Sequence, residues 1–453
     1  MIGAGVAGLT CAYRLTEAGI ATDVYERWPG LGGQAATLDV GDGVLLERYY
    51  HHLFTNDLHM LDLCEELGLG DALVAHEASA AIAINDRIWP FNGALDLLRF
   101  RPIPFHTRLR MGLAMLRIQL SRDEPSDHGD ETARAWIERN IGKAGWAGIW
   151  GPLMRGKFGD RADQISMAWI WAKVGKRRNM KDGRAAQEAF IYPEGSFEPI
   201  FVELRRRIEA AGGKVMIGRP AVSLTRADGR IEVLPGAPDS FRRGLDPREF
   251  EPDGAAIGYD AVVCCVPNEV FIQLLDPSLS AQVGDEYLGR LRAIEHFASL
   301  TMLLELDRPL TEHYWTNVAD RRCPFVGVIE QSRLNGTEST GGRCFTYLAN
   351  YLAQDDELLG LDADEVLDAY EEGLRIIDPD WDRARIRRRW LFRELSAQPI
   401  VGPGYAAGIS ARQTPAAGLF LVNTTQIYPE DRGTNYAVRD GDAAARELIT
   451  TLT

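Results

Sequence analysis

A run of glycines close to the start of the chain has the spacing of a phosphate-binding turn. The residues are Gly3, Gly5 and Gly8, with Val6 and Ala7 between the last two glycines. The first glycine permits a tight turn, the second lets the backbone approach a pyrophosphate, and the third lets the next helix pack closely on a sheet. Free N–H groups at the start of that helix attract phosphate oxygens. The spacing predicts a dinucleotide site; a glycine-rich turn without a ligand is the alternative.

An acidic residue stands where such a site requires one. Glu26 ends the strand that follows the helix, at about the 20-residue distance that this fingerprint needs, and its carboxylate can accept hydrogen bonds from ribose hydroxyls. A strand of about five residues should precede Gly3, but only Met1 and Ile2 are there. We therefore expect the natural start to lie upstream; an incomplete edge of the sheet is the alternative.

A second glycine-rich segment follows Glu26. An acid–arginine pair, Glu26 and Arg27, is followed by Gly32, Gly33 and Gln34. This resembles the second FAD signature of the flavin amine oxidase superfamily, which includes protoporphyrinogen oxidases, phytoene-type desaturases and, more distantly, UDP-galactopyranose mutase. The resemblance implies FAD binding, with Arg27 near the adenosine or pyrophosphate. Backbone N–H groups at the two glycines meet the pyrophosphate without a Cβ in the way.

Later segments extend the resemblance to the middle and the end of the chain. By similarity to the family, Val222 lies beside the adenine and the strand around 418–425 leads towards the ribityl chain. Asn423 or Thr424 stands where the family often has an acidic residue. The last segment, similar to the final FAD motif, opens a helix whose N-terminus points at the flavin ring; its cofactor-binding residues are Gly433, Thr434, Asn435 and Tyr436.

The pattern of strands and helices predicts an α/β protein. We expect a discontinuous, Rossmann-type FAD-binding domain and a second, α+β substrate domain. The first comprises residues 1–88, 186–290 and 400–453, and the second comprises 89–185 and 291–399. Within the first, the proline-rich and charged segment 235–259 is expected to be a surface loop. Only one dinucleotide fingerprint is present, so no separate NAD(P)H domain is expected.

Candidate catalytic side chains follow the strand at 44–46. Tyr50, His51 and His52 open a segment that, by resemblance, passes beside the flavin and is similar to one in UDP-galactopyranose mutase. A histidine there can hydrogen-bond the flavin or carry a proton; a structural histidine pair at a strand end is the alternative. Tyr428 and the charged residues 430–432 precede the last motif and are expected on the substrate side of the ring. The tryptophan-rich stretch 145–171 lines a substrate pocket or packs in a core.

A basic, leucine-rich segment stands out in an otherwise acidic chain. Residues 97–122 hold six arginines and no acid, with leucines at helical spacing. This pattern predicts contact with a membrane or an anionic lipid-like substrate; a helix that buries its leucines in the substrate domain is the alternative. The net charge of −15 argues against nucleic-acid binding. Six cysteines without zinc-type spacing predict no metal site and a cytoplasmic protein, membrane-associated at the inner face if the basic segment binds lipid.

Together these features predict an FAD-dependent oxidoreductase. The expected reaction is the oxidation, dehydrogenation or desaturation of a small organic, partly apolar substrate, because the cofactor carries the redox chemistry and the protein positions it. A non-redox, flavin-dependent UDP-sugar mutase is the alternative. That reading rests on the segment from His51 to Asn56 and on the arginines, which suit a diphosphate.

Overall fold

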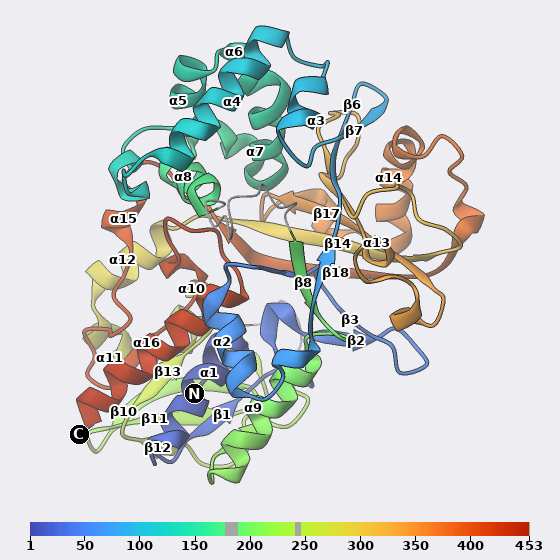
Figure 1. Cartoon of the computed structure of the whole chain (residues 1–453). Coiled ribbons are helices and arrows are strands. Elements are labelled where there is room, and N and C mark those ends of the chain that lie inside the picture. The colour runs from blue at the N-terminus through green and yellow to red at the C-terminus, as the bar shows by residue number, and fades with distance from the viewer. Residues whose placement is uncertain (177–188, 241–245, 453) are drawn as a thin grey trace.

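The computed structural model describes residues 1–176, 189–240 and 246–452. Figure 1 shows three regions: a nucleotide-binding region that holds both ends of the chain, a large sheet in the middle, and a cap of helices on the far side of that sheet. The expected domain boundary between residues 185 and 186 lies outside the described residues.

A small parallel sheet forms the centre of the nucleotide-binding region. Its strands are β9 (Lys214–Met216), β1 (Asp23–Tyr25), β13 (Val262–Cys264) and β19 (Leu419–Leu421). Ile2 forms parallel bridges to Tyr25 and Cys264, so the residue before the glycine turn occupies the central strand position between β1 and β13. The Rossmann-type arrangement predicted from the glycine spacing is confirmed.

Helices cover both faces of this sheet. The first is α1 (Val6–Glu17), and it crosses α16 (Thr434–Leu452) closely, because a Cβ at Gly441 would lie 2.5 Å from the carbonyl oxygen of Ala7. Further helices are α2 (Leu58–Glu66), α9 (Glu198–Ala210), α10 (Asn268–Leu274), α11 (Pro277–Val283) and α12 (Asp285–Ala293). Buried Cys11 and Leu15 of α1 meet Leu448 of α16 over the sheet, so the two ends of the chain share one core.

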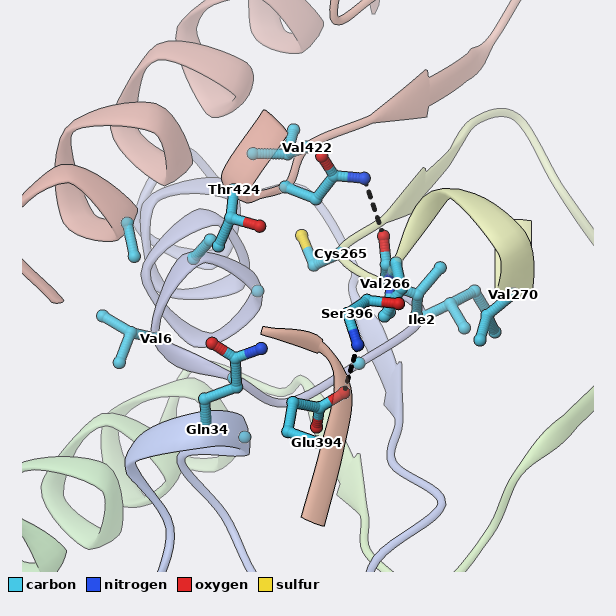
Figure 2. A pocket seen from close by; sticks show the side chains of 18 of the residues that line it. Ile2, Val6, Gln34, Cys265, Val266, Val270, Glu394, Ser396, Val422 and Thr424 are labelled. Carbon is cyan, nitrogen blue, oxygen red and sulfur yellow. Dashed lines mark hydrogen bonds between the residues drawn. The ribbon is translucent and has the colours of Figure 1, made fainter. Parts of the chain in front are cut away.

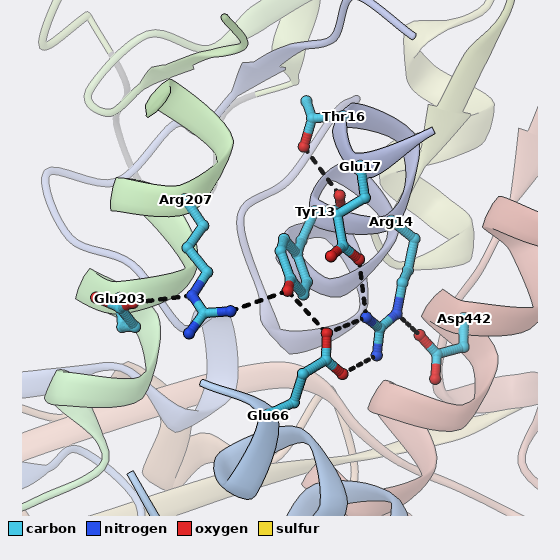
Figure 3. Close-up of polar contacts among 8 residues, drawn as sticks. All are labelled: Tyr13, Arg14, Thr16, Glu17, Glu66, Glu203, Arg207 and Asp442. Atoms are coloured by element: carbon cyan, nitrogen blue, oxygen red, sulfur yellow. Dashed lines mark hydrogen bonds and ion pairs between the residues drawn. The ribbon is translucent and has the colours of Figure 1, made fainter. Parts of the chain in front are cut away.

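A polar network joins four of these elements, as Figure 3 shows. Arg14 of α1 donates to both Glu66 oxygens, at 2.5 and 2.8 Å, and to Asp442 of α16 at 2.8 Å. The Tyr13 hydroxyl donates to Glu66 and accepts from Arg207 of α9. The Arg14 hydrogen bonds lower the pKa of Glu66, so the carboxylate stays charged and holds α2 against α1.

An antiparallel three-stranded sheet lies beside the parallel one. It consists of β10 (Ala221–Ala227), β11 (Arg230–Pro235) and β12 (Ile257–Tyr259). The expectation that residues 235–259 are a surface loop is wrong in part, because its last residues form β12 and Phe250 is buried. The composition favours an exposed loop, but Phe250 and Pro247 are apolar and pack against β10 and α10. The free energy gained by burying them holds this segment against the sheet.

The large central sheet has the strand order β18-β14-β17-β16-β15-β6-β7. Its strands are β18 (Ile386–Pro399), β14 (His296–Leu306), β17 (Cys344–Leu352), β16 (Gly327–Glu330), β15 (Trp315–Val318), β6 (Ala80–Ile84) and β7 (Arg87–Pro90). The helix α14 (Ala363–Ile377) packs against it, and short strands β4 (Leu53–Phe54), β8 (Ala189–Pro193) and β5 (Leu73–Glu77) form a neighbouring sheet. Because β6 pairs with β15, the expected boundary at residue 88 falls inside this sheet, and we propose that it lies near residue 79.

The cap is helical, as the pattern of residues 89–185 predicts. It contains α3 (Ala94–Arg99), α4 (Phe105–Leu120), α5 (Ala133–Asn140), α7 (Gly151–Phe158) and α8 (Met167–Lys176). Trp146, Trp169 and Trp171 are buried in its core, so the packing interpretation of the tryptophan-rich stretch holds for these three. The alternative in which α4 buries its leucines is wrong: Leu113 is 68% exposed, while Met111 and Ile118 are buried.

Candidate functional site

One long cleft runs from the start of α1 to the start of α16. It encloses about 1520 Å³ of space, including its open mouth. The glycine turn, the adjacent strand ends and the end of β18 line it, and Figure 2 shows Val6, Gln34, Glu394 and Thr424 around the same space. Segments from the beginning, middle and end of the chain therefore meet at one site.

The glycines of both predicted motifs are required by the backbone around this cleft. A Cβ at Gly8 would lie 2.1 Å from the carbonyl oxygen of Gly3, so only glycine allows α1 to leave the turn there. Gly33 has φ +61°, and a Cβ on it would lie 3.0 Å from the Cα of Gly5. Gly5 also bridges Gly32. The two turns thus pack backbone against backbone and leave a shallow, side-chain-free cradle beside the N–H groups of α1.

The predicted ribose-binding acid, Glu26, is buried at one side of the cradle. Its two oxygens accept hydrogen bonds from the backbone N–H of Ala4, at 2.7 Å, and of Trp28, at 2.8 Å. Burial raises the pKa of Glu26, and these two backbone donors oppose the rise. The carboxylate lines the cleft and retains lone pairs for further donors, which is the chemistry that a ribose diol needs.

Two arginines line the cradle beside Glu26. One, Arg27, is the predicted residue. The other, Arg48, was not predicted: it donates to the Gly33 carbonyl oxygen at 2.8 Å, and its guanidinium lies 4.9 Å from the centre of the Trp28 ring. Arg48 directly follows β3 (Leu45–Glu47), which pairs with β2 (Thr37–Asp39). Its place at the cradle depends on this strand pairing, so no motif in the sequence singles it out. Both cations suit a pyrophosphate.

The predicted residues of the last motif divide between the cleft and the interior. Gly433 and Thr434 line the cleft at the start of α16. Asn435 instead accepts a hydrogen bond from the Met60 backbone N–H at 3.1 Å, and Tyr436 lies under the Arg439 guanidinium; the cleft lining includes neither.

Of two further predicted residues, Asn423 and Val222, only the first lines the cleft. Asn423 lines it, and its amide donates to the Val266 carbonyl oxygen at 2.9 Å, which joins the ends of β13 and β19. Val222 is buried and absent from the lining, where Ala221 and Pro220 stand in its place. The roles assigned to these residues by resemblance stay predictions.

The histidine pair is split by the fold. His51 lines the cleft, and its Nδ1 lies 2.5 Å from the Tyr49 carbonyl oxygen. His52 points the other way, hydrogen-bonds the Tyr314 hydroxyl at 2.8 Å and packs edge-on against Phe190. Burial lowers the pKa of His51 to about 4 and that of His52 to about 3, so both rings are neutral near pH 7. His52 thus has the surroundings of a structural residue.

The two predicted tyrosines lie outside the cleft lining. Tyr50 packs edge-on against Trp315, with ring centres 5.0 Å apart. The Tyr428 hydroxyl lies 3.2 Å from Ser166 Oγ in the cap. Their catalytic roles stay predictions.

Arg432 is the cation at the α16 end of the cleft. Its guanidinium donates to Gln398 at 3.1 Å and to the Tyr351 hydroxyl at 3.0 Å, with a longer contact to Gln34. Within the described parts of the chain no carboxylate lies within ion-pairing distance of it. Strand ends from the central sheet also reach the cleft here and were not predicted: His296, Glu394 and Ser396.

These features fit FAD. The cradle has no side chains to block a pyrophosphate, Glu26 offers a ribose acceptor, and the N-termini of α1 and α16 lie at the two ends of one cleft. When bound, FAD would supply the site with an acceptor for a hydride, that is, for two electrons and one proton. No group of acidic, histidine or cysteine side chains in the described ranges can hold a metal ion.

The fold and the cleft are those of a dinucleotide-binding flavoprotein. A family model described as flavin containing amine oxidoreductase matches residues 6–449, and the chain belongs to that family. It is an FAD-dependent oxidoreductase, as the sequence predicts.

Solved structures share the fold. A putative protoporphyrinogen oxidase from Exiguobacterium sp. 255-15 has 18% identity and a TM-score of 0.74, with 99% of this chain and 97% of that chain covered. A reduced UDP-galactopyranose mutase has 15% identity and a TM-score of 0.73 over 99% and 94%.

A 15-cis-phytoene desaturase of Synechococcus elongatus is 44% identical over 71 residues. That match spans 16% of this chain and 15% of the desaturase, so it identifies one similar segment and not a shared substrate.

Proposed function

We propose that the enzyme oxidises a small organic, partly apolar molecule at the α16 end of the FAD cleft. The observation that carries this proposal is an aromatic cluster joined to the cation at that end. Tyr50 packs edge-on against Trp315 and Tyr347, and its pKa is raised well above the usual range, chiefly by burial. None of these rings lines the cleft itself, but Tyr351 joins the cluster to Arg432, which does. An apolar cluster beside the cleft suits apolar substrate surface, and the cation suits one polar group.

The chain's own groups have separate tasks in this proposal. The N-terminus of α16 and the Arg432 guanidinium favour negative charge at their end of the cleft. His51 donates its Nδ1–H to the Tyr49 carbonyl oxygen, which leaves Nε2 as the basic nitrogen. A neutral imidazole at neutral pH can take a proton from a substrate C–H or N–H group at that atom.

The test is anaerobic reduction of the bound flavin. Purified protein is mixed with panels of amines, polyenes and cyclic alkanes or alkenes, and the flavin absorbance near 450 nm is followed. We expect at least one partly apolar compound to bleach the flavin in stoichiometric amount, with recovery on adding oxygen or a quinone. Failure of every panel with fully FAD-loaded protein would refute the proposal.

A UDP-sugar mutase is the second candidate, and the arginine at the α16 end of the cleft favours it. Arg432 offers donors of the kind that a sugar nucleotide's diphosphate requires. The mutase-like segment supports it less, since His52 packs into the aromatic core. Ring contraction of UDP-galactopyranose by dithionite-reduced protein, without net flavin oxidation, would establish this candidate in place of the first.

We also infer that α3 and α4 contact the surface of an anionic membrane. Their exposed side chains include seven large apolar residues: Leu95, Leu98, Phe105, Leu109, Leu113, Leu116 and Leu120. Among the residues that the structure describes, four arginines beside them, at positions 99, 101, 117 and 122, have no ion pair or side-chain hydrogen bond. A contiguous apolar face rimmed by cations is typical of helices that lie in the lipid interface. Across the described residues, no helix is long and apolar enough to cross a membrane.

Sedimentation with liposomes tests the membrane contact. Protein should sediment with phosphatidylserine-containing vesicles at low salt and much less with neutral vesicles. The double variant Leu113→Ser, Leu120→Ser should lose most of this binding, whereas Leu452→Ser, at an exposed leucine on α16, should not. Equal sedimentation of both variants, or none by the unmodified protein, would contradict the inference.

A further inference from the structure

Three polar residues of the central sheet line the cleft and have no task in the proposed oxidation. They are His296, at the start of β14, and Glu394 and Ser396, near the end of β18. We call these three residues the polar wall. Figure 2 shows Glu394 and Ser396 reaching from β18 into the space between Gln34 and Val266. The central sheet therefore contributes directly to the cleft that the nucleotide-binding region opens.

An irregular pairing of β18 with β14 accompanies the polar wall. Glu394 pairs with Ser299 of β14. Four residues later, Gln398 pairs with Phe297, which is only two residues from Ser299. The extra residues of β18 form a bulge, a device that turns side chains out of the regular alternation of a strand. Gln398, where regular pairing resumes, accepts from Arg432 at 3.1 Å, so the bulge lies beside the α16 end of the cleft.

The polar wall has hydrogen-bonding capacity that the chain leaves unused. The Glu394 carboxylate accepts one long hydrogen bond, from the Ser396 N–H at 3.4 Å, and has no ion pair among the residues that the structure describes. The His296 side chain is only 2% exposed, yet its Nδ1 has no hydrogen-bond partner in those parts of the chain. The Glu269 carboxylate lies 3.7 Å from this nitrogen, beyond hydrogen-bonding distance. A buried polar atom without a partner is costly, so a ligand that supplies the partner is favoured.

Neutral hydroxyl groups suit the polar wall better than a further charged group does. Burial lowers the pKa of His296, and the Glu269 and Glu394 carboxylates oppose this shift, so the ring is neutral near pH 7 and offers one donor and one acceptor nitrogen. The Arg432 guanidinium also lowers this pKa, which means that its positive potential reaches the polar wall. That potential opposes an added ammonium group, and the Glu394 carboxylate opposes an added anion. A chain of hydroxyl groups, each able to donate and to accept, avoids both costs.

We propose that the polar wall binds the ribityl hydroxyl groups of FAD. A dinucleotide whose pyrophosphate lies in the glycine cradle and whose ring lies at the start of α16 must place its hydroxylated chain between the two. The polar wall lines the same cleft as Gln34, which directly follows the cradle glycines, and as Arg432 at the α16 end. Glu394 accepts hydrogen bonds from the hydroxyl groups, and His296 supplies the donor or acceptor that each hydroxyl still lacks. This role does not depend on which substrate the enzyme oxidises.

The test compares FAD with an analogue in which hydrogen atoms replace the ribityl hydroxyl groups. Apoprotein is titrated with each compound, with flavin fluorescence as the signal, so the measurement needs neither substrate nor turnover. We expect the unmodified protein to bind FAD roughly tenfold more tightly than the analogue. Glu394→Ala should reduce this preference about fivefold, because it removes the acceptor that only the hydroxyl groups use. Glu232→Ala, at a partly buried acid on β11 outside the cleft lining, should leave the preference unchanged.

The ratio of the two affinities separates recognition of the hydroxyl groups from stability of the fold. A variant that only loosens the protein weakens FAD and the analogue equally, and its melting temperature falls. If Glu394→Ala does not fold, His296→Phe, which keeps a ring without nitrogen atoms, serves in its place and should also reduce the preference. Equal binding of FAD and the analogue by the unmodified protein would overturn the proposal. An undiminished preference in Glu394→Ala and His296→Phe would overturn it as well, and is the result expected if the polar wall serves a hydroxyl group of the substrate instead.

Discussion

Removing the Glu26 carboxylate is expected to weaken both FAD binding and the fold of the glycine turn. In Glu26→Ala the N–H groups of Ala4 and Trp28 lose their acceptor. Each unsatisfied buried N–H costs about 1–3 kcal/mol, so the turn is destabilised even without cofactor. The lost ribose contact adds about 1–3 kcal/mol to binding, which corresponds to a rise in the FAD dissociation constant of about 5- to 150-fold.

The assay separates these two effects. Apoprotein is titrated with FAD, with flavin fluorescence as the signal, and its melting temperature is measured without FAD. Glu26→Gln keeps the shape and one acceptor oxygen, so its FAD affinity should fall between those of the unmodified protein and Glu26→Ala. Glu251→Ala, at an exposed acid in the same region, is the matched control. An unchanged dissociation constant in Glu26→Ala would refute the role given to this carboxylate.

Three further changes have equally defined outcomes. Gly8→Ala places a Cβ 2.1 Å from a backbone oxygen, so the purified protein should lack yellow colour, whereas Gly289→Ala, with no atom within 4 Å of its Cβ, should retain full flavin absorbance. Since the pKa of His51 is about 4, the pH profile of kcat/KM should show no ionisation of this residue from about pH 5.5 to 8; a His51→Asn variant that abolishes an ionisation in that window would contradict this. Burial raises the pKa of Glu47 to about 7, so its proton stabilises the fold below about pH 4.5 and this contribution is lost as the pH rises through 7. In Glu47→Gln the unfolding free energy should therefore fall less between about pH 4.5 and 7, by on the order of 3 kcal/mol. The unfolding free energy is measured by urea melts at each pH. The same pH dependence in Glu47→Gln as in the unmodified protein would show that another group is responsible.

Local signals in the sequence predicted the cradle well. The spacing of the first glycines and Glu26 depends only on one turn, one helix and one strand, so neighbouring residues determine it. The same local reasoning does not separate His51 from His52, because adjacent residues on an extended segment point to opposite sides and only tertiary packing decides which side is the cleft. Ser396 and His296 line the cleft from β18 and β14, two paired strands of the central sheet that are far from the glycine turn in the sequence. No local sequence pattern identifies them.

The helix α4 shows the same limit in another form. Its leucine spacing predicts one apolar face, but a second apolar row, which includes Met111 and Ile118, packs into the cap. Periodicity identifies faces and does not rank them when both are apolar. The second row is buried in the cap, where α4 contacts α8, and Leu113 and Leu120 remain exposed to solvent.

The crossing of α1 and α16 has a consequence for how the protein is made. The cradle at Gly3–Gly8 leaves the ribosome long before the helix that completes the cleft, which begins at Thr434. At about 5–20 residues per second, the N-terminal turn waits roughly 20–90 s for its partner, with the apolar face of α1 still uncovered. During that time a nascent chain lacks the cleft residues from Val422 to Asp440, so we expect it to bind FAD weakly. Stable capture of the cofactor is therefore expected only after α16 has been translated, and prematurely terminated chains should remain colourless.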